Sequence, residues 1–337
     1  MKKILVCLLL AVVLAVACER SVIQDAEAYV CSLLEKNVKT EQALVRDPLF
    51  AETEQPVTDT LDVTLYYRYG QTNILGMESA LLEAERQESV AAQIVEQLIA
   101  GPDAAHGRLS GVFPRGTDVY PVTESGSTVF VTLSREFLGK PDGAPEDWED
   151  SAYWQEEATL RRWLAAQSII CALTEGGRYQ RVQLYVADAA DSVARRIPLC
   201  YFDLSVMDTT VVLAASSRDE AAILTPQRAI QMIFDGWQRR DWESVYALLC
   251  ADETGHLPTL SAFEAQMRAE DATLLTAEAS FGSVNAGGNA ATLMVDGAVR
   301  LKDGGSFRLI RQSVPMVRVS DNWAMRFDTL LSLMNAE

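Results

Sequence analysis

One feature of the sequence constrains this fold more than any other. It is the order in which strand-like and helix-like hydrophobic patterns follow one another. Between residues 61 and 186, apolar residues recur at every second position in some segments and at every third or fourth position in others. These are the periods of half-buried strands and of amphipathic helices. The order strand, helix, strand, strand, helix, strand predicts an α+β fold in which two helices cover one face of an antiparallel or mixed sheet. The strand-like segments are 61–68, 117–123, 128–134 and 182–186, and the helix-like segments are 78–100 and 156–174.

The N-terminus has the pattern of an export signal. A basic start is followed by an unbroken apolar run, 4–17, and then by Cys18. The run is shorter than the ~20 apolar residues that a membrane-spanning helix needs, and the whole pattern is typical of a secretory signal peptide. The segment Ala-Val-Ala-Cys at 15–18 resembles the lipobox of bacterial lipoproteins, with Ala15 where leucine is commonest. This resemblance implies that residues 1–17 are removed and that lipid on Cys18 anchors the chain at the extracytoplasmic face of the cell membrane. Ordinary secretion and an uncleaved anchor are the alternatives.

Composition and charge restrict the classes of partner. A hydrophobic fraction of 49% and a charged fraction of 23% are those of a globular protein with real cores. At ~150 residues per domain, the length predicts two domains after the signal peptide. The formal net charge of −18 repels phosphate backbones and anionic lipid heads. Nucleic acid is therefore excluded as a partner, and membrane contact is expected through the lipid on Cys18.

Four cysteines remain after the signal peptide and Cys18 are set aside, and they allow three pairings. A chain with two hydrophobic cores does not need disulfides for stability, so we expect mostly reduced and buried thiols. The four are Cys31, Cys171, Cys200 and Cys250.

Short motifs in residues 60–200 resemble the GerM-type sporulation and spore-germination domain, while the preceding residues 18–59 lack a sustained period and are expected to form a tether. The matching segments are LIAGP at 98–102, FPRGT at 113–117, LSREF at 133–137 and ALTE at 172–175, followed by the strand at 182–186; Thr132 stands where the family usually has aspartate. The resemblance implies a ring-building-like fold with the same element order. It also implies a non-enzymatic module of an extracytoplasmic envelope protein, with no catalytic residues to transfer.

The hydrophobic pattern predicts a second α+β domain at 225–337. A junction at 201–224 separates it from the first domain. Two helix-like patterns near 226–237 and 242–249 precede four strand-like segments, and turn-forming residues separate the strands. With the motifs R-x-D-W-x-x-V-Y-x-L-L and D-N-W-x-M-x-F, this region resembles an NTF2-like domain, which is a cone of helices and a curved sheet. The strand-like segments are 273–284, 290–301, 307–319 and 323–327.

An NTF2-like cone usually encloses a pocket, and the resemblance makes Trp237, Trp242 and Tyr246 candidate lining residues. Core packing is the alternative role for these three rings. The fold hosts both enzymes and binding proteins, so the resemblance alone fixes no function.

The sequence offers no recognised catalytic, cofactor or metal motif. The only two histidines, His106 and His256, lie in predicted loops, and neither HExxH nor CxxC occurs. A nucleophile elbow, a Walker loop and a dinucleotide-binding glycine motif are missing as well. We therefore expect no enzymatic activity, no cofactor and no metal.

Residues 141–157 contain seven acidic residues and no lysine or arginine. A Ca²⁺ loop is one interpretation, but the spacing of an EF-hand is missing, and a solvated loop before a helix is the simpler one. Trp148 and Trp154 lie in or beside this run, and aromatic residues on a surface mark contact patches. They are candidate interface residues.

These observations predict a lipid-anchored envelope protein that acts without catalysis as a protein-interaction or scaffold module. Other envelope proteins are the expected partners, in a homo- or hetero-oligomer, and the family resemblance implies a role in sporulation or germination. The alternative is a small-ligand binding protein or hydrolase that uses a pocket in the NTF2-like domain.

Overall fold

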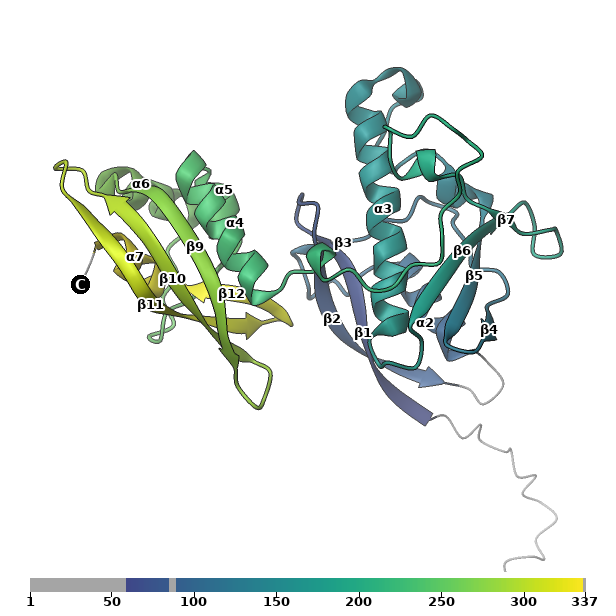
Figure 1. Cartoon of the computed structure of the whole chain (residues 1–337), viewed down its shortest axis with the longest axis horizontal. Helices are drawn as coiled ribbons and strands as arrows, with labels where there is room; N and C mark the ends of the chain where they lie inside the picture. The colour runs from purple at the N-terminus through teal and green to yellow at the C-terminus, as the bar shows by residue number, and fades with distance from the viewer. Residues whose placement is uncertain (1–58, 85–88, 336–337) are drawn as a thin grey trace, which may run out of the picture. The chain divides into compact units, whose positions relative to one another are not determined.

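A computed structural model of the chain describes residues 59–84 and 89–335, all of which belong to one compact unit, Thr58–Glu337 (Figure 1). The expected signal peptide, Cys18, Cys31 and nearly all of the tether lie outside the described residues. None of the helices in the described part of the chain has the length and apolar character needed to cross a membrane.

The first sheet is built on a long hairpin. β1 (Asp59–Tyr69) pairs antiparallel with β2 (Leu75–Ala84), and the short β3 (Leu109–Ser110) pairs with the other edge of β1. The helix expected over 78–100 is therefore wrong in its first part, because α2 comprises only Val90–Ala100. Residues of β2 such as Glu78 and Leu82 suit a helix, but pairing along the whole length of β1 overrides that weak preference.

The second sheet has the strand order β4-β5-β6-β7. β4 (Thr123–Ser125) and β5 (Thr128–Ser134) form a hairpin as expected, but β4 begins only where the predicted strand 117–123 ends. β6 (Arg181–Ala187) pairs parallel with β5, and β7 (Arg195–Arg196) closes the far edge.

Helix α3 (Ala152–Thr174) packs against β1 of the first sheet and against β6 of the second (Figure 1). The expected single sheet with two helices on one face is therefore wrong: two sheets share one helix. The reason lies in the C-terminal half of α3, residues 164–173, where side chains are buried around most of the helix rather than along one stripe. A helix of this kind needs neighbours on more than one side.

The C-terminal region has the expected order of helices followed by strands. α4 (Pro226–Arg239), α5 (Trp242–Tyr246) and α6 (Leu260–Glu270) precede the sheet. The expected caps form, because the side chains of Thr225 and Asp241 accept hydrogen bonds from the backbones of Arg228 and Ser244, at 3.2 Å each.

The sheet that follows is a four-stranded antiparallel meander, extended at one edge by a short parallel strand. Helix α7 (Phe327–Asn335) follows the last strand and packs against it. The order of α4, α5 and the four antiparallel strands agrees with the predicted elements, whereas β8 and α7 were not predicted, and the NTF2-like assignment stays a prediction. The strands are β9 (Thr273–Val284), β10 (Ala290–Arg300), β11 (Ser306–Val319), β12 (Asn322–Arg326) and the added β8 (Leu249–Cys250).

Candidate functional site

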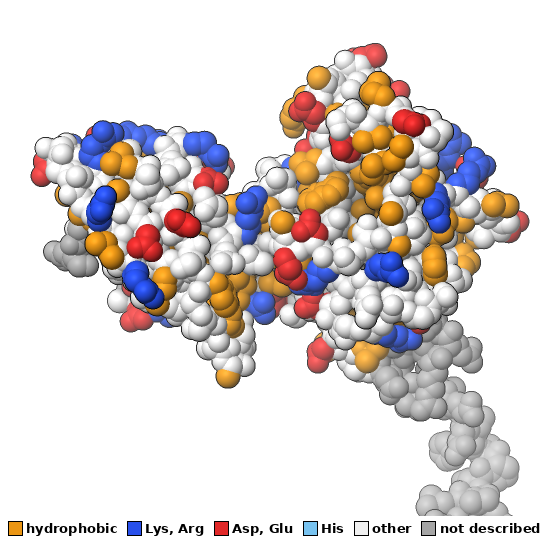
Figure 2. Space-filling model, viewed as in Figure 1, with side chains coloured by type: hydrophobic (Ala, Val, Ile, Leu, Met, Phe, Trp, Pro, Cys, Tyr) orange, Lys and Arg blue, Asp and Glu red, His pale blue; other side chains and the backbone are white. Residues whose placement is uncertain are grey.

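The segment that leads into α3 presents acidic side chains and aromatic rings together. A single 3-10 turn, η2 (Trp148–Asp150), is followed at once by α3. Tyr153 is 65% exposed, whereas Trp148 and Trp154 are half-buried. Figure 2 shows acidic and hydrophobic side chains side by side over the end of the molecule where α3 begins. We define the acidic–aromatic surface as Trp148, Tyr153, Trp154 and the exposed carboxylates Glu146, Asp147, Glu149, Asp150 and Glu156.

A buried arginine fixes the first of these rings. The guanidinium of Arg162 lies 5.6 Å from the ring centroid of Trp148 and 5.4 Å from that of Tyr201. Its Nη2 donates to the carbonyls of Leu138 (2.9 Å) and Gly139 (3.1 Å). Because a cation between two rings and two carbonyls has little freedom, Arg162 holds the ring of Trp148 in one position.

The remaining two rings support each other. Tyr153 and Trp154 meet edge to face, with centroids 5.2 Å apart and planes inclined by 76°. This is the arrangement that aromatic quadrupoles favour. The side chain of Gln155 donates to the carbonyl of Glu149, which ties η2 to the first turn of α3.

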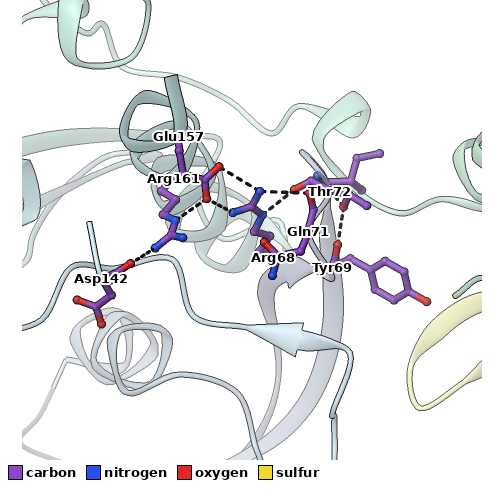
Figure 3. A network of polar contacts seen from close by, with 8 residues as sticks. Arg68, Tyr69, Gln71, Thr72, Asp142, Glu157 and Arg161 are labelled. Atoms are coloured by element: carbon purple, nitrogen blue, oxygen red, sulfur yellow. Dashed lines mark hydrogen bonds and ion pairs between the residues drawn. The ribbon is translucent and has the colours of Figure 1, made fainter. Parts of the chain in front are cut away.

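A network of charged side chains attaches the acidic run and the first turns of α3 to β1 (Figure 3). The carboxylate of Glu157 accepts hydrogen bonds from Arg68 on β1 and, at 2.7 Å, from Nε of Arg161. Burial disfavours the ionised carboxylate, but the hydrogen bonds and charges of the two arginines outweigh it and lower the pKa of Glu157. Arg161 also donates to the carbonyl of Asp142 at 2.8 Å, so the acidic run is attached at both ends.

The exposed carboxylates of the surface are largely free to interact with a partner. Glu146 pairs with Lys140 at 2.6 Å, whereas Asp147, Glu149, Asp150 and Glu156 form no ion pair within residues 59–84 and 89–335. In the same residues, no group of three or more His, Cys, Asp or Glu side chains is arranged to hold a metal ion. The acidic–aromatic surface therefore combines held aromatic rings with carboxylates that have no ion pair among the described residues.

The three aromatic residues expected at an NTF2-like pocket lie in or against the hydrophobic core. Trp237 is 1% exposed and its indole N–H donates to the carbonyl of Ala272 at 2.9 Å. Trp242 packs edge to face on Phe263, and the hydroxyl of Tyr246 donates to the carbonyl of Pro258 at 2.7 Å. The linings of the four cavities described for residues 59–84 and 89–335 contain none of the three. This placement fits the core-packing alternative, and a pocket role stays a prediction.

The motif segments that carry the family resemblance serve the scaffold. Gly101 ends α2 with a φ of 96°. Thr117 is buried and donates through its hydroxyl to the carbonyl of Pro114 at 2.7 Å, which closes the FPRGT turn. Phe137, fully buried, packs against Phe113 with ring centroids 6.2 Å apart.

Sequence reasoning missed the residues that hold the surface in place. Arg162 and Arg68 are charged residues on a helix and a strand, and such residues are usually expected to face solvent. Both are buried here, at 7% and 5% exposure. The one available signal was an arginine beside the apolar stripe of a predicted helix, and it does not name its partners.

The cysteines of the described residues are unpaired. Cys171 is buried, while Cys200 and Cys250 are partly exposed. Burial raises the pKa of the Cys171 thiol to about 12, so it remains protonated and behaves as a small apolar side chain.

Comparison with known proteins finds one family model that matches part of this chain. No curated protein matches it. Among solved structures, the chain is similar to the first GerMN domain of the sporulation protein GerM from Bacillus subtilis, with 18% identity, a TM-score of 0.25, and coverage of 40% of this chain and 98% of that one. The tandem GerMN domains of the same protein give 16% identity and a TM-score of 0.27, with 66% of this chain and 76% of that one covered. A putative lipoprotein from Clostridium perfringens gives 18% identity, a TM-score of 0.24, and coverage of 41% and 83%. Residues 64–191 match the family model described as "Germane: Sporulation and spore germination", which confirms the resemblance found in the first module and covers less than half of the chain.

Proposed function

We propose that this chain is a lipid-anchored, extracytoplasmic envelope protein that binds another envelope protein without catalysis, in a process related to sporulation or germination. The Germane match over residues 64–191 supports the process. The acidic–aromatic surface carries the binding role, because three ordered rings are bordered by carboxylates that have no ion pair among the described residues.

The charge of the surface specifies the chemistry of the partner. A partner with an apolar or aromatic centre and a rim of lysine or arginine would pair with Asp147, Glu149, Asp150 and Glu156. Rim charges of this kind mainly raise the association rate, and salt screens them over a Debye length of about 8 Å at physiological ionic strength. Binding should therefore weaken as the salt concentration rises.

Photo-crosslinking tests the proposal. A photoreactive residue placed at Tyr153, which is 65% exposed, should cross-link to one envelope protein in intact membranes, with the product identified by mass spectrometry. Replacing Glu149 and Asp150 together by lysine should reduce the yield at least fivefold, because it reverses the charge of the rim.

A matched control uses a second exposed apolar side chain. A photoreactive residue at Ile310, which is 72% exposed on β11, should not capture the same protein. Equal capture from both positions, or no effect of the charge reversal, would show that the acidic–aromatic surface is not the binding site.

The anchor needs a separate test. Cys18→Ser should prevent acylation and leave a soluble or uncleaved species, because two acyl chains hold a protein on a membrane where a single chain is marginal. Incorporation of labelled fatty acid and membrane fractionation measure the effect. A variant that partitions with membranes like the wild type, together with no label in the wild type, would rule out the lipoprotein assignment.

A further inference from the structure

A cavity of about 380 Å³ lies where β1 and β3 approach β8 and β12. This volume is within the ~300–1,000 Å³ range of small-molecule sites. Tyr69 and Trp323 provide aromatic wall, and Leu109, Leu249 and Leu257 provide aliphatic wall. The cavity is separate from the acidic–aromatic surface, and it uses none of the three rings predicted to line a pocket.

The charge of the lining is opposite to that of the whole chain. The sequence has 47 acidic and 29 basic residues, yet the cavity lining contains Arg108 and no aspartate or glutamate. Nη1 of Arg108 donates to the hydroxyl of Tyr69 (3.2 Å) and to the carbonyl of Ala247, whereas its Nε and Nη2 groups have no partner among the described residues. A guanidinium remains charged at all ordinary pH values, and its free N–H groups fit an oxyanion.

A second donor lies in the same wall. Trp323 is 4% exposed, and its indole N–H has no acceptor within residues 59–84 and 89–335. The indole N–H is not fully enclosed by the protein, so water or a ligand can reach it. Because Trp323 lines the cavity, a ligand in the cavity could supply that acceptor.

The nearest carboxylates, Glu78 and Asp321, lie beside the lining residue His106 and do not themselves line the cavity. His106 lies between two carboxylates, with Nδ1 3.6 Å from Glu78 and Nε2 3.7 Å from Asp321. Asp321 also accepts the backbone N–H of Ser79 at 2.9 Å. Burial raises the pKa of the Cys250 thiol, so that group remains neutral near the cavity.

We propose that this cavity binds a small amphiphilic anion, whose oxyanion head contacts Arg108 and the indole N–H of Trp323. Its short apolar body would lie against Leu249, Leu257 and the ring of Tyr69. Carboxylates and phosphate monoesters share this head-group chemistry. A binding role of this kind goes beyond the proposed protein–protein function and does not depend on it.

Calorimetric titration of the full chain in phospholipid nanodiscs tests the proposal, with empty nanodiscs as the blank. The probes are hexanoate, hexyl phosphate and hexanol, which share one apolar body. At least one anion should bind saturably and at least tenfold more tightly than hexanol. Whichever anion binds more tightly identifies a carboxylate or a phosphate head. Binding of hexanol as tight as that of both anions, or no saturable binding of either anion, would overturn the proposal.

Variants separate the head-group contacts from folding. Arg108→Gln should weaken anion binding at least tenfold, Arg108→Lys should retain part of it, and Trp323→Phe should weaken it severalfold while keeping the aromatic wall. Arg115→Gln is the matched control, because Arg115 is 91% exposed in its side chain and does not line this cavity. A folded Arg108→Gln chain, shown by an unchanged circular dichroism spectrum, that binds the anion like the wild type would contradict the assignment.

Discussion

At the scale of single residues, Gly101 shows how a short motif serves the scaffold. It ends α2 with φ 96° and ψ 173°, and its N–H donates to the carbonyl of Gln97 at 3.2 Å. A Cβ added to Gly101 would meet no atom within 4 Å, so the cost of a substitution comes from the backbone alone. This region of φ and ψ is essentially restricted to glycine and costs other residues about 1–3 kcal/mol.

Gly101→Val should therefore lower the free energy of unfolding by about that amount, ~1–3 kcal/mol, in a chemical denaturation experiment. Gly107→Ala is the control, since Gly107 also has open space around it but no left-handed φ. Partner capture by Gly101→Val should fall only in proportion to the unfolded fraction. A variant of wild-type stability that no longer captures the partner would place this turn in the binding surface.

Glu157 gives the second prediction at this scale, through its lowered pKa. Because the folded pKa lies below the unfolded one, ionised Glu157 stabilises the fold above the ordinary glutamate pKa. That contribution disappears as the pH falls through the folded pKa. Glu157→Gln should lower the free energy of unfolding near neutral pH. It should also make that free energy fall less steeply as the pH is lowered. Chemical denaturation from neutral pH to below the ordinary glutamate pKa measures both effects. Glu156→Gln, an exposed neighbour, should leave the profile unchanged, and a Glu157→Gln profile as steep as the wild type would contradict the assignment.

At the scale of elements, α3 organises the segments around it through one side chain. Arg162 connects η2, the Leu138–Gly139 carbonyls and η3 (Leu199–Tyr201) to the helix. Arg162→Met leaves two carbonyls without their donor and should cost about 1–3 kcal/mol. Amide hydrogen exchange should also become faster in residues 145–151.

Arg178→Met is the matched control for this variant. Arg178 also stacks on a ring, that of Tyr179 at 5.2 Å, but its side chain is 66% exposed. Exposed cation–π and ion-pair contacts contribute only up to about 1 kcal/mol. If both variants lose the same free energy of unfolding, the burial of Arg162 adds nothing to stability.

Elements whose signals are local could be predicted, and elements that depend on distant pairing could not. The starts of α4 and α5 follow from Thr225 and Asp241, because a cap and its helix are adjacent in sequence. β2 was missed because its strand character comes from pairing with β1, and residues such as Glu78 and Leu82 have no strong preference of their own. For the same reason, the aromatic candidates Trp148 and Trp154 could be found, while their support by Arg162 and Tyr201 could not.

At the scale of the whole molecule, the described residues form one compact unit, with a continuous set of buried side chains from Leu65 to Met334. The division into two domains at 201–224 stays a prediction. Individual hydrogen bonds connect the residues before this division with the residues in and after it. Leu224 donates its N–H to the carbonyl of Leu75 at 2.8 Å. Asn322 acts like an added strand residue: its amide accepts from Met77 N–H at 2.8 Å and donates to Met77 C=O at 3.0 Å. No sequence pattern shows a side chain that replaces a backbone partner.

We expect Asn322 to contribute to unfolding in a single step. The wild-type chain should show a single calorimetric transition, because the Met77 peptide is buried and paired with Asn322. Asn322→Ala leaves that N–H and C=O without partners, at a cost of about 1–3 kcal/mol. The free energy that couples unfolding of the N-terminal sheet to unfolding of the C-terminal sheet falls by the same amount. The single calorimetric peak should therefore broaden or divide into two. Asn289→Ala, in the exposed turn before β10, should retain one peak. If Asn322→Ala keeps the wild-type midpoint and a single peak, the two regions are held together by their shared apolar core, and the amide bridge adds no cooperativity.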